Sequence, residues 1–205
     1  MTQYGFYYNV DSCIGCKTCA AACKDKNNLD VGLKYRKVID YEGGKWAVKD
    51  EVPVPENIFC YSVSIACNHC QEPACTKVCP TSAMTKREDG IVYVNENKCI
   101  GCGYCVWACP YGAPRLNVQK KVMGKCDFCR DLIDKGENPA CVDACPMRCM
   151  EYGEIAELRA KYGDNASVEP LPSPDTTKPS VVIKPSRLNP DNLPGKVINP
   201  EEELL

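Results

Sequence analysis

The sequence predicts an α+β fold in which a small cysteine-rich unit occurs twice, with a β-rich insert and a proline-rich tail. Three observations support this prediction. Sixteen of the 18 cysteines fall into four groups of four, the groups repeat in order along the 205 residues, and prolines recur from residue 163 onward.

The cysteine spacing predicts iron–sulfur chemistry. The groups are, in order, Cys13, Cys16, Cys19 and Cys23; Cys67, Cys70, Cys75 and Cys79; Cys99, Cys102, Cys105 and Cys109; and Cys126, Cys129, Cys141 and Cys145. The first and third have the C-x2-C-x2-C-x3-C run of bacterial ferredoxins, in which the fourth cysteine binds a neighbouring cluster. Sixteen soft thiolate ligands, at four per cubane, predict four [4Fe–4S] clusters and a protein that carries electrons.

The groups also repeat in sequence. Residues 13–23 align with residues 99–109, and residues 73–80 align with residues 139–146. A repeated order of this kind indicates an internal duplication. We therefore expect a duplicated bacterial two-[4Fe–4S] ferredoxin-like fold.

Each group should form a tight loop followed by a short helix. The first three cysteines belong to the loop, and the helix begins near the third and carries the fourth. Gly15 and Gly101 should let the loop backbone approach the cluster. Proline follows the fourth cysteine in groups two to four and should end the helix there, whereas Lys24 follows Cys23 and lets the first helix run on.

Strands and one further helix are expected around the groups. Residues 4–10 read as a strand, and residues 85–94 read as a hairpin with an Asp-Gly turn. A strand is expected at 150–153, and a helix at 154–162 that has Ile155 and Leu158 on one face. Within the insert, we expect a hairpin around residues 42–44 and a strand at 58–65.

Four parts of the chain follow from this reading. Residues 1–33 and 120–162 should form an outer ferredoxin-like lobe with groups one and four, and residues 67–119 an inner lobe with groups two and three. Residues 34–66 form the β-rich insert. The tail, 163–205, should be extended, because each proline removes a backbone donor. Its apolar run at 181–183 favours an arm that lies on a partner over a disordered tail.

Composition excludes several functions. The net charge of −2, from 25 basic and 27 acidic residues, gives no case for nucleic-acid binding. No run of 18 apolar residues is present, so no direct membrane span is expected. The first residues show neither a secretory signal nor a twin-arginine pair. There is no nucleotide-binding motif and no catalytic machinery, so we expect a protein that is not an enzyme.

Two other uses of cysteine compete with iron–sulfur clusters. A disulfide scaffold does not need repeated C-x2-C-x2-C-x3-C runs. Zinc sites use separated C-x2-C pairs, so zinc stays open mainly for the fourth group, and a zinc-structured interaction module stays open as another class of protein. Cys60 and Cys149, outside the groups, should be buried small hydrophobes rather than ligands.

Other side chains near the groups have modest expected roles. The single histidine, His69, is expected to form a hydrogen bond near a cluster ligand rather than to bind iron. Five basic residues near the groups are expected to be solvated surface charges, although they could raise cluster potentials. They are Lys17, Lys24, Lys77, Arg115 and Lys125.

Several stretches resemble the iron–sulfur (B) subunits of the dimethyl sulfoxide reductase family. They are CNHCQEPACTKVCP at 67–80, KREDG at 86–90, ACPYGAP at 108–114, TKPSVVIKP at 177–185 and QYGF at 3–6. The resemblance covers nearly the whole chain. It implies a relay of electrons between a membrane anchor subunit that oxidises quinol and a molybdopterin catalytic subunit.

The resemblance also implies which cysteines share a cluster. Cluster 1 has Cys13, Cys16, Cys19 and Cys145; cluster 2 has Cys67, Cys70, Cys75 and Cys109; cluster 3 has Cys99, Cys102, Cys105 and Cys79; cluster 4 has Cys126, Cys129, Cys141 and Cys23. Two clusters then lie in each lobe, in a line of four, and cluster 1 faces the molybdenum subunit.

The resemblance also implies a substrate and a location, each with alternatives. Anaerobic dimethyl sulfoxide reductase is the expected complex. The insert and final tail match it less well, so related reductases of polysulfide, tetrathionate, selenate or aromatic compounds stay open, as does a free polyferredoxin carrier. The family implies a peripheral place on the cytoplasmic membrane, on its outer face after export with the catalytic subunit, with the cytoplasmic face as the alternative.

Overall fold

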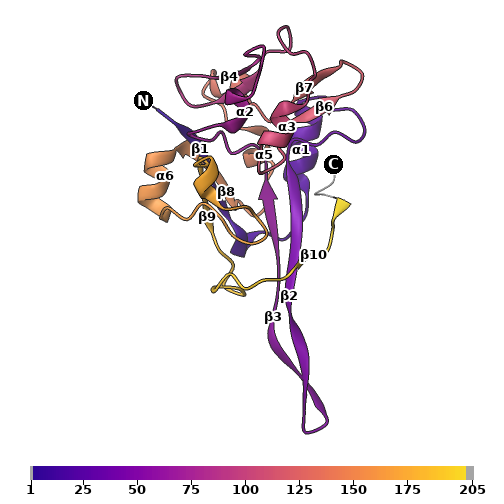
Figure 1. Cartoon of the computed structure of the whole chain (residues 1–205). Helices are drawn as coiled ribbons and strands as arrows, with labels where there is room; N and C mark the ends of the chain where they lie inside the picture. The colour runs from indigo at the N-terminus through magenta and orange to yellow at the C-terminus, as the bar shows by residue number, and fades with distance from the viewer. Residues whose placement is uncertain (1, 202–205) are drawn as a thin grey trace.

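A three-stranded sheet joins the beginning of the chain to segments far along it (Figure 1). The computed structural model describes residues 2–201. Strand β1 (Tyr4–Asn9) pairs antiparallel with β8 (Met150–Glu154) and parallel with β9 (Val181–Lys184). The strands predicted at 4–10 and 150–153 are confirmed.

Both faces of this sheet are covered, because aromatic side chains alternate along β1. Phe6 stacks on Phe128 at a centroid distance of 4.2 Å, and Tyr7 on the opposite face stacks on Tyr162 at 3.6 Å. Tyr162 ends helix α6 (Ile155–Tyr162), whose Ile155 and Leu158 are buried against Tyr7. The predicted helix and its apolar face are confirmed.

A long hairpin extends from the cysteine-rich body (Figure 1). It consists of β2 (Lys37–Lys49) and β3 (Val52–Ile65), paired antiparallel. The turn predicted around residues 42–44 is wrong. Asp50 and Glu51 make the turn, both with positive φ, whereas Gly44, also with positive φ, lies at a bulge where the register shifts. Glycine here bends the strand rather than reversing it.

Short helices follow the cysteine loops. They are α1 (Thr18–Lys26), α2 (Ala74–Lys77), α3 (Tyr104–Ala108) and α5 (Ala140–Asp143). Each begins within one residue of the third cysteine of its group. The longer α1 confirms that the first helix runs on, and it carries Cys23. In the other groups the helix ends before the fourth cysteine, because the residue before proline avoids helical geometry.

The remaining short elements flank these helices. They are the 3-10 turns Val10–Ser12 and Pro174–Thr176, helix α4 (Arg130–Ile133), and the paired strands β4 (Met84–Lys86) with β5 (Val92–Val94) and β6 (Arg115–Asn117) with β7 (Val122–Gly124). The hairpin predicted at 85–94 is confirmed. The expected lobe boundary at 119/120 lies in the turn between β6 and β7.

The tail lies on its own chain. Besides β9, it forms β10 (Lys196–Val197), which pairs with β2. The tail was expected to be extended, and two of its segments are strands that pair with earlier parts of the chain. Pro179 and Pro185 stand just outside β9 and leave its donors free to pair. Val182 is fully buried, so this apolar run gives no reason to expect a partner. The last part of the predicted tail, 202–205, and residue 1 lie outside the described residues.

Candidate iron–sulfur centres

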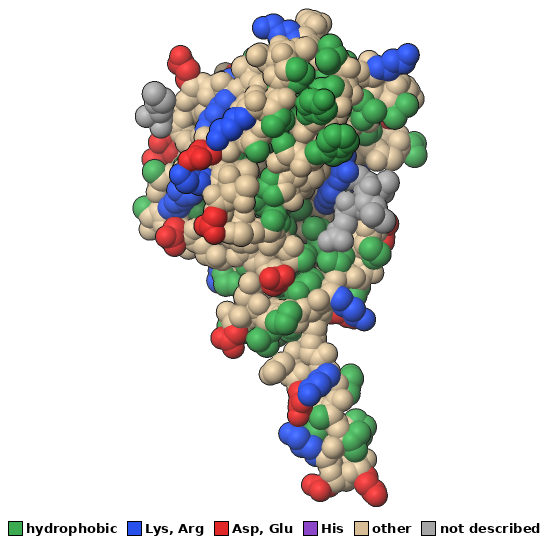
Figure 2. All heavy atoms as spheres, viewed as in Figure 1, with side chains coloured by type: hydrophobic (Ala, Val, Ile, Leu, Met, Phe, Trp, Pro, Cys, Tyr) green, Lys and Arg blue, Asp and Glu red, His purple; other side chains and the backbone are tan. Residues whose placement is uncertain are grey.

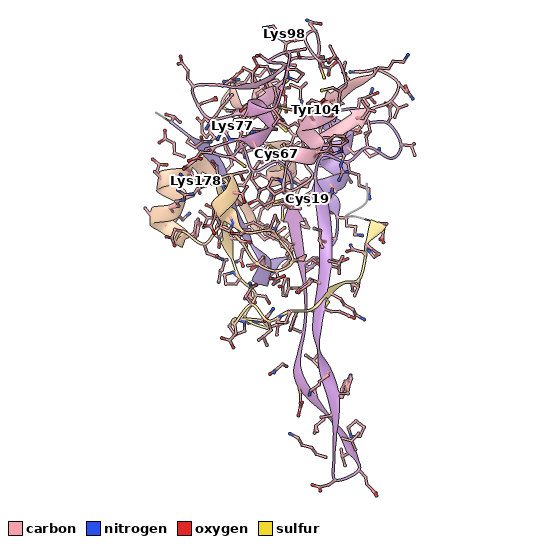
Figure 3. The ribbon with its side chains drawn as sticks, in the orientation of Figure 1. Cys19, Cys67, Lys77, Lys98, Tyr104 and Lys178 are labelled. Carbon is pink, nitrogen blue, oxygen red and sulfur yellow. The ribbon has the colours of Figure 1, made fainter. Side chains whose placement is uncertain are left out.

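The topology brings the first and fourth groups together, and the second and third. Pairing of β1 with β8 places the loop after β1 beside the segment before β8. Helix α1 contacts α5, and α2 contacts α3. Figure 3 shows Cys19 and Cys67 inside the body above the hairpin.

Three cavities are each lined by four cysteines of the four groups. The sets are Cys13, Cys16, Cys19 and Cys145; Cys67, Cys70, Cys75 and Cys109; and Cys79, Cys99, Cys102 and Cys105. In each set, three cysteines come from one group and the fourth from another. The donors are thiols, the ligand that iron–sulfur clusters require.

The other four group cysteines are wholly interior. Cys23, Cys126, Cys129 and Cys141 are all buried. Burial raises the pKa of Cys23 to about 12, Arg36 opposes this, and the neighbouring thiols of Cys141 and Cys129 add to it. The thiols of Cys23, Cys129 and Cys141 therefore lie close enough in the core to influence one another electrostatically.

None of the 18 cysteines, all within residues 2–201, forms a disulfide. In that described part of the chain, no three side chains of the ligating types form a group that could hold a single metal ion. Three of the cysteine sets instead line a shared cavity, which suits a four-iron cubane.

The buried thiols hold their protons in the absence of iron. Burial raises the pKa of Cys75 to about 12, and the pKa of Cys70 and of Cys105 to about 11. Because iron binds the thiolate, assembly of a cluster must release these protons.

Neighbouring cysteines connect the four sets in a row. Burial raises the pKa of Cys19, Arg36 opposes this, and the nearby thiol of Cys141 adds to it. Cys19 of the first set therefore lies close to Cys141 of the fourth. Cys126 and Cys67 belong to one buried apolar cluster, and Cys75 and Cys105 belong to another. The sets of clusters 1, 4, 2 and 3 are thus adjacent in that order. The end sets each contain one exposed cysteine, Cys16 or Cys102.

Two buried cations lie between these sets. Arg36 donates from Nη1 to Ser64 Oγ over 3.0 Å, and that hydroxyl is 3.3 Å from Cys19 Sγ. Lys125 Nζ lies 3.4 Å from Cys67 Sγ and donates to the carbonyls of Val92 and Cys126. The expectation that Lys125 is a surface charge is therefore wrong, whereas Lys77 is exposed as expected.

His69 is fully buried beside the same region. Its Nδ1 accepts from the backbone N–H of Val92 at 2.9 Å, and its Nε2 is 3.7 Å from Cys126 Sγ. Desolvation, reinforced by the charge of Lys125, holds the pKa of His69 well below its usual range. A neutral ring with its proton on Nε2 can donate towards Cys126, which agrees with the role expected for it.

The two extra cysteines differ in environment. Cys149 is buried, as expected, but it lines the cavity of Cys13, Cys16, Cys19 and Cys145. Its hydrogen bond to Cys13 lowers the pKa of Cys13 to about 6 and raises that of Cys149. Cys60 is exposed on β3, so its expected burial is wrong.

Three side chains that contact the cysteine sets had no signal in the sequence. Arg36 and Ser64 come from the insert. Thr177 comes from the tail, is buried, and its Oγ1 lies 3.3 Å from Cys70 Sγ. The backbone N–H groups of Gln71 and Glu72 donate to the carbonyls of Lys178 and Thr177 and hold Thr177 at this cavity, so no local spacing could have indicated it.

In the part of the chain that the structure describes, no helix has the length and apolar character needed to cross a membrane.

Comparisons with known proteins agree with the cysteine geometry. A family model described as a 4Fe-4S dicluster domain matches residues 58–155, and one described as a 4Fe-4S binding domain matches residues 10–30. The chain is 51% identical over 204 residues to the B subunit of the anaerobic dimethyl sulfoxide reductase of Escherichia coli, and the match covers 98% of each protein.

Two more distant relatives are subunits of other reductases. The B subunit of the polysulfide reductase of Wolinella succinogenes is 34% identical over 189 residues, covering 90% of this chain and 95% of the relative. The thiosulfate reductase electron transfer subunit of Salmonella typhi is 37% identical over 161 residues, covering 76% and 78%. The chain therefore belongs to the iron–sulfur (B) subunits of the dimethyl sulfoxide reductase family, and it is an electron-transfer subunit rather than a catalytic one.

Proposed function

We propose that this chain relays electrons through four [4Fe–4S] clusters between a membrane anchor subunit that oxidises quinol and a molybdopterin catalytic subunit. The observation that carries the proposal is the composition of the three cavities, each lined by three cysteines of one group and the fourth of another. That is the ligand arrangement of two-cluster ferredoxins.

The proposed ligand sets are those expected from the resemblance. Cluster 1 uses the cavity of Cys13 and Cys145, cluster 2 that of Cys67 and Cys109, and cluster 3 that of Cys99 and Cys79. Cluster 4 uses the buried set with Cys23. When bound, each cluster accepts and releases one electron. The protein's own part is to hold the thiolates, exclude water from the middle two clusters, and supply buried positive charge between neighbouring sets.

The proposal includes a duplicated architecture, with an outer lobe for clusters 1 and 4 and an inner lobe for clusters 2 and 3. Equivalent backbone geometry supports it. Gly15 and Gly101 both have φ of +67°, and a Cβ on either would approach a neighbouring hairpin, at Ser62 Oγ (2.6 Å) or the Lys121 carbonyl oxygen (2.5 Å). These glycines allow a hairpin to pack against the cysteine loop, a reason for them that differs from close approach to a cluster.

Apolar surfaces at the two ends support two protein partners. Beside Cys102, the exposed side chains of Tyr104 and Trp107 stack with centroids 6.0 Å apart. Hydrophobic side chains gather over this upper part of the molecule, near α3 and β6 (Figures 1 and 2). Beside Cys16, at the other end of the row, Ile14 and Met147 are exposed. Such patches are typical of interaction sites.

Dimethyl sulfoxide reductase is the complex we favour. The identity of 51% to its B subunit exceeds the 34% to the polysulfide reductase subunit. Co-purification separates this role from that of a free carrier. A subunit should be isolated with a large molybdenum protein, whereas a carrier should elute alone.

Replacing one exposed ligand tests the relay. Cys102→Ser should convert or remove cluster 3, because a thiolate ligand is lost. Quinol-linked activity of the complex should then fall sharply, while the catalytic subunit still turns over with an artificial dye donor. Cys60→Ser is the matched control, since Cys60 is exposed but outside the groups, and it should change neither activity. Unchanged quinol-linked turnover in Cys102→Ser would contradict a linear relay.

A further inference from the structure

Cys149 is a fifth sulfur in the cavity of cluster 1. Its side chain is 4% exposed, and its Sγ lies 3.4 Å from Cys145 Sγ. It lines this cavity together with Cys13. Its own carbonyl accepts from the backbone N–H of Asn9 at 2.8 Å, so the strand that leads into the first cysteine loop fixes its position.

The position of Cys149 recurs in the repeats. In groups two, three and four, the residue three after the fourth cysteine donates its N–H to that cysteine's carbonyl and has positive φ. These residues are Ser82 (φ 52°, 3.2 Å), Gly112 (φ 56°, 3.1 Å) and Arg148 (φ 49°, 3.2 Å). The turn is therefore the same in all three, and it presents the next residue in the same way.

The next residue faces the cysteine set in each case. It is Ala83 in the cavity with Cys79, Ala113 in the cavity with Cys109, and Cys149 in the cavity with Cys145. Ala83 and Ala113 each present only a methyl group to their cysteine set. Cys149 presents a thiol at the equivalent position.

We propose that Cys149 is a reserve ligand of cluster 1, able to bind the iron that Cys145 holds. The inference rests on the proposed ligand set of that cluster. In the exchange, Cys145 releases iron as Cys149 binds it, and one proton passes from Cys149 Sγ to Cys145 Sγ. One iron–sulfur bond breaks and one forms, and no electron is gained or lost. Where Cys145 is absent, the proton of Cys149 goes to solvent.

The location gives such a ligand a use. Cluster 1 is at an end of the row, where Cys16 is exposed and Ile14 beside it is 63% exposed. Solvent and oxidants reach this end more easily than the buried set of cluster 4. A second thiol next to Cys145 would retain iron when one ligand is displaced.

Alanine replacements in the anaerobically purified complex test the proposal. Alanine is used because a serine hydroxyl could itself bind iron. Cys145→Ala should keep about sixteen iron and sixteen sulfide per chain, at four of each per cubane, and show no EPR signal of a three-iron cluster. The matched control is Cys109→Ala, the equivalent residue of group three, whose nearby residue is Ala113. It should lose at least one iron.

Two further variants separate the reserve ligand from the ligand set. Cys149→Ala alone should keep all four clusters, and Cys145→Ala with Cys149→Ala should lose iron as Cys109→Ala does. Loss of iron in Cys145→Ala to the same extent as in the double variant would overturn the reserve role while leaving the ligand set intact. Full iron in the double variant would overturn the ligand set of cluster 1 and the inference with it.

Discussion

Lys125 and Arg36 are buried cations that are surrounded by thiols rather than carboxylates. Both are 4% exposed. A buried charge is costly unless it is paired, and the nearby cysteines, ionised when they bind iron, provide that pairing. Each cation lies where two cysteine sets meet, so it stabilises added negative charge at the neighbouring clusters.

Removing the charge of Lys125 should therefore lower the midpoint potential of cluster 2. A unit charge a few ångströms away is worth about 3 kcal/mol at an effective dielectric constant of 20, or about 130 mV for a one-electron couple. Lys125→Met should show a shift of this order in an EPR-monitored redox titration, with full iron content. Lys125→Arg, which keeps the charge, should shift it much less. Four unchanged potentials in Lys125→Met would show that this charge does not act on the relay.

Residue roles were predictable only where spacing carries chemistry. The sixteen group cysteines are found by their intervals, because a cubane loop requires them. The burial of Lys125 and the orientation of Cys149 depend on packing between segments distant in sequence, and no local pattern reports it. A lysine next to a ligand cysteine looks the same in sequence whether it is buried or solvated.

At the scale of elements, the tail is part of the core. β9 pairs with β1, Thr177 contacts Cys70, and the Asn199 side chain donates to the Val38 carbonyl of β2 at 2.9 Å. The apolar run of β9 is buried by this chain itself. A partner-binding role for the exposed part of the tail stays a prediction, but removal of the tail should also weaken the fold.

A single truncation in β9 measures this contribution. Ile183 is 2% exposed, so Ile183→Ala should destabilise the protein by about 2–5 kcal/mol through lost burial and a cavity. The midpoint of denaturant-induced cluster bleaching should fall accordingly. Leu188→Ala is the control, because Leu188 is 56% exposed and its loss should change stability by no more than about 0.5 kcal/mol. Equal midpoints for both variants would mean that β9 contributes nothing to the fold.

Elements next to the cysteine groups were predicted best. Their strands and helices follow from alternation, proline positions and the Asp-Gly turn. The hairpin turn was misplaced because two adjacent glycines look like a turn, whereas the actual turn uses Asp50 and Glu51, which rarely adopt positive φ. The tail strands were missed because their partners, β1 and β2, lie near the other end of the chain.

At the scale of the whole molecule, the cysteine sets form a row with one exposed cysteine at each end. A row of this kind suits passage of electrons from one partner to another. We propose that it operates on the outer face of the cytoplasmic membrane, exported in folded form with a catalytic partner that carries a twin-arginine signal.

Protease access to intact spheroplasts tests that location. An exposed complex should be digested without lysis, as judged by immunoblot against this chain. A cytoplasmic marker protein should stay intact in the same sample. Complete protection of the chain until lysis would place the complex on the cytoplasmic face.

Four [4Fe–4S] clusters held by sixteen cysteines are the basis of the proposed relay. Iron and acid-labile sulfide analysis of the anaerobically purified complex tests their presence most directly, with the count normalised to this chain and any clusters of the partner subunits subtracted. The expected result is about sixteen iron and sixteen sulfide per chain, at four of each per cubane. A clear zinc content with little iron and sulfide would contradict it.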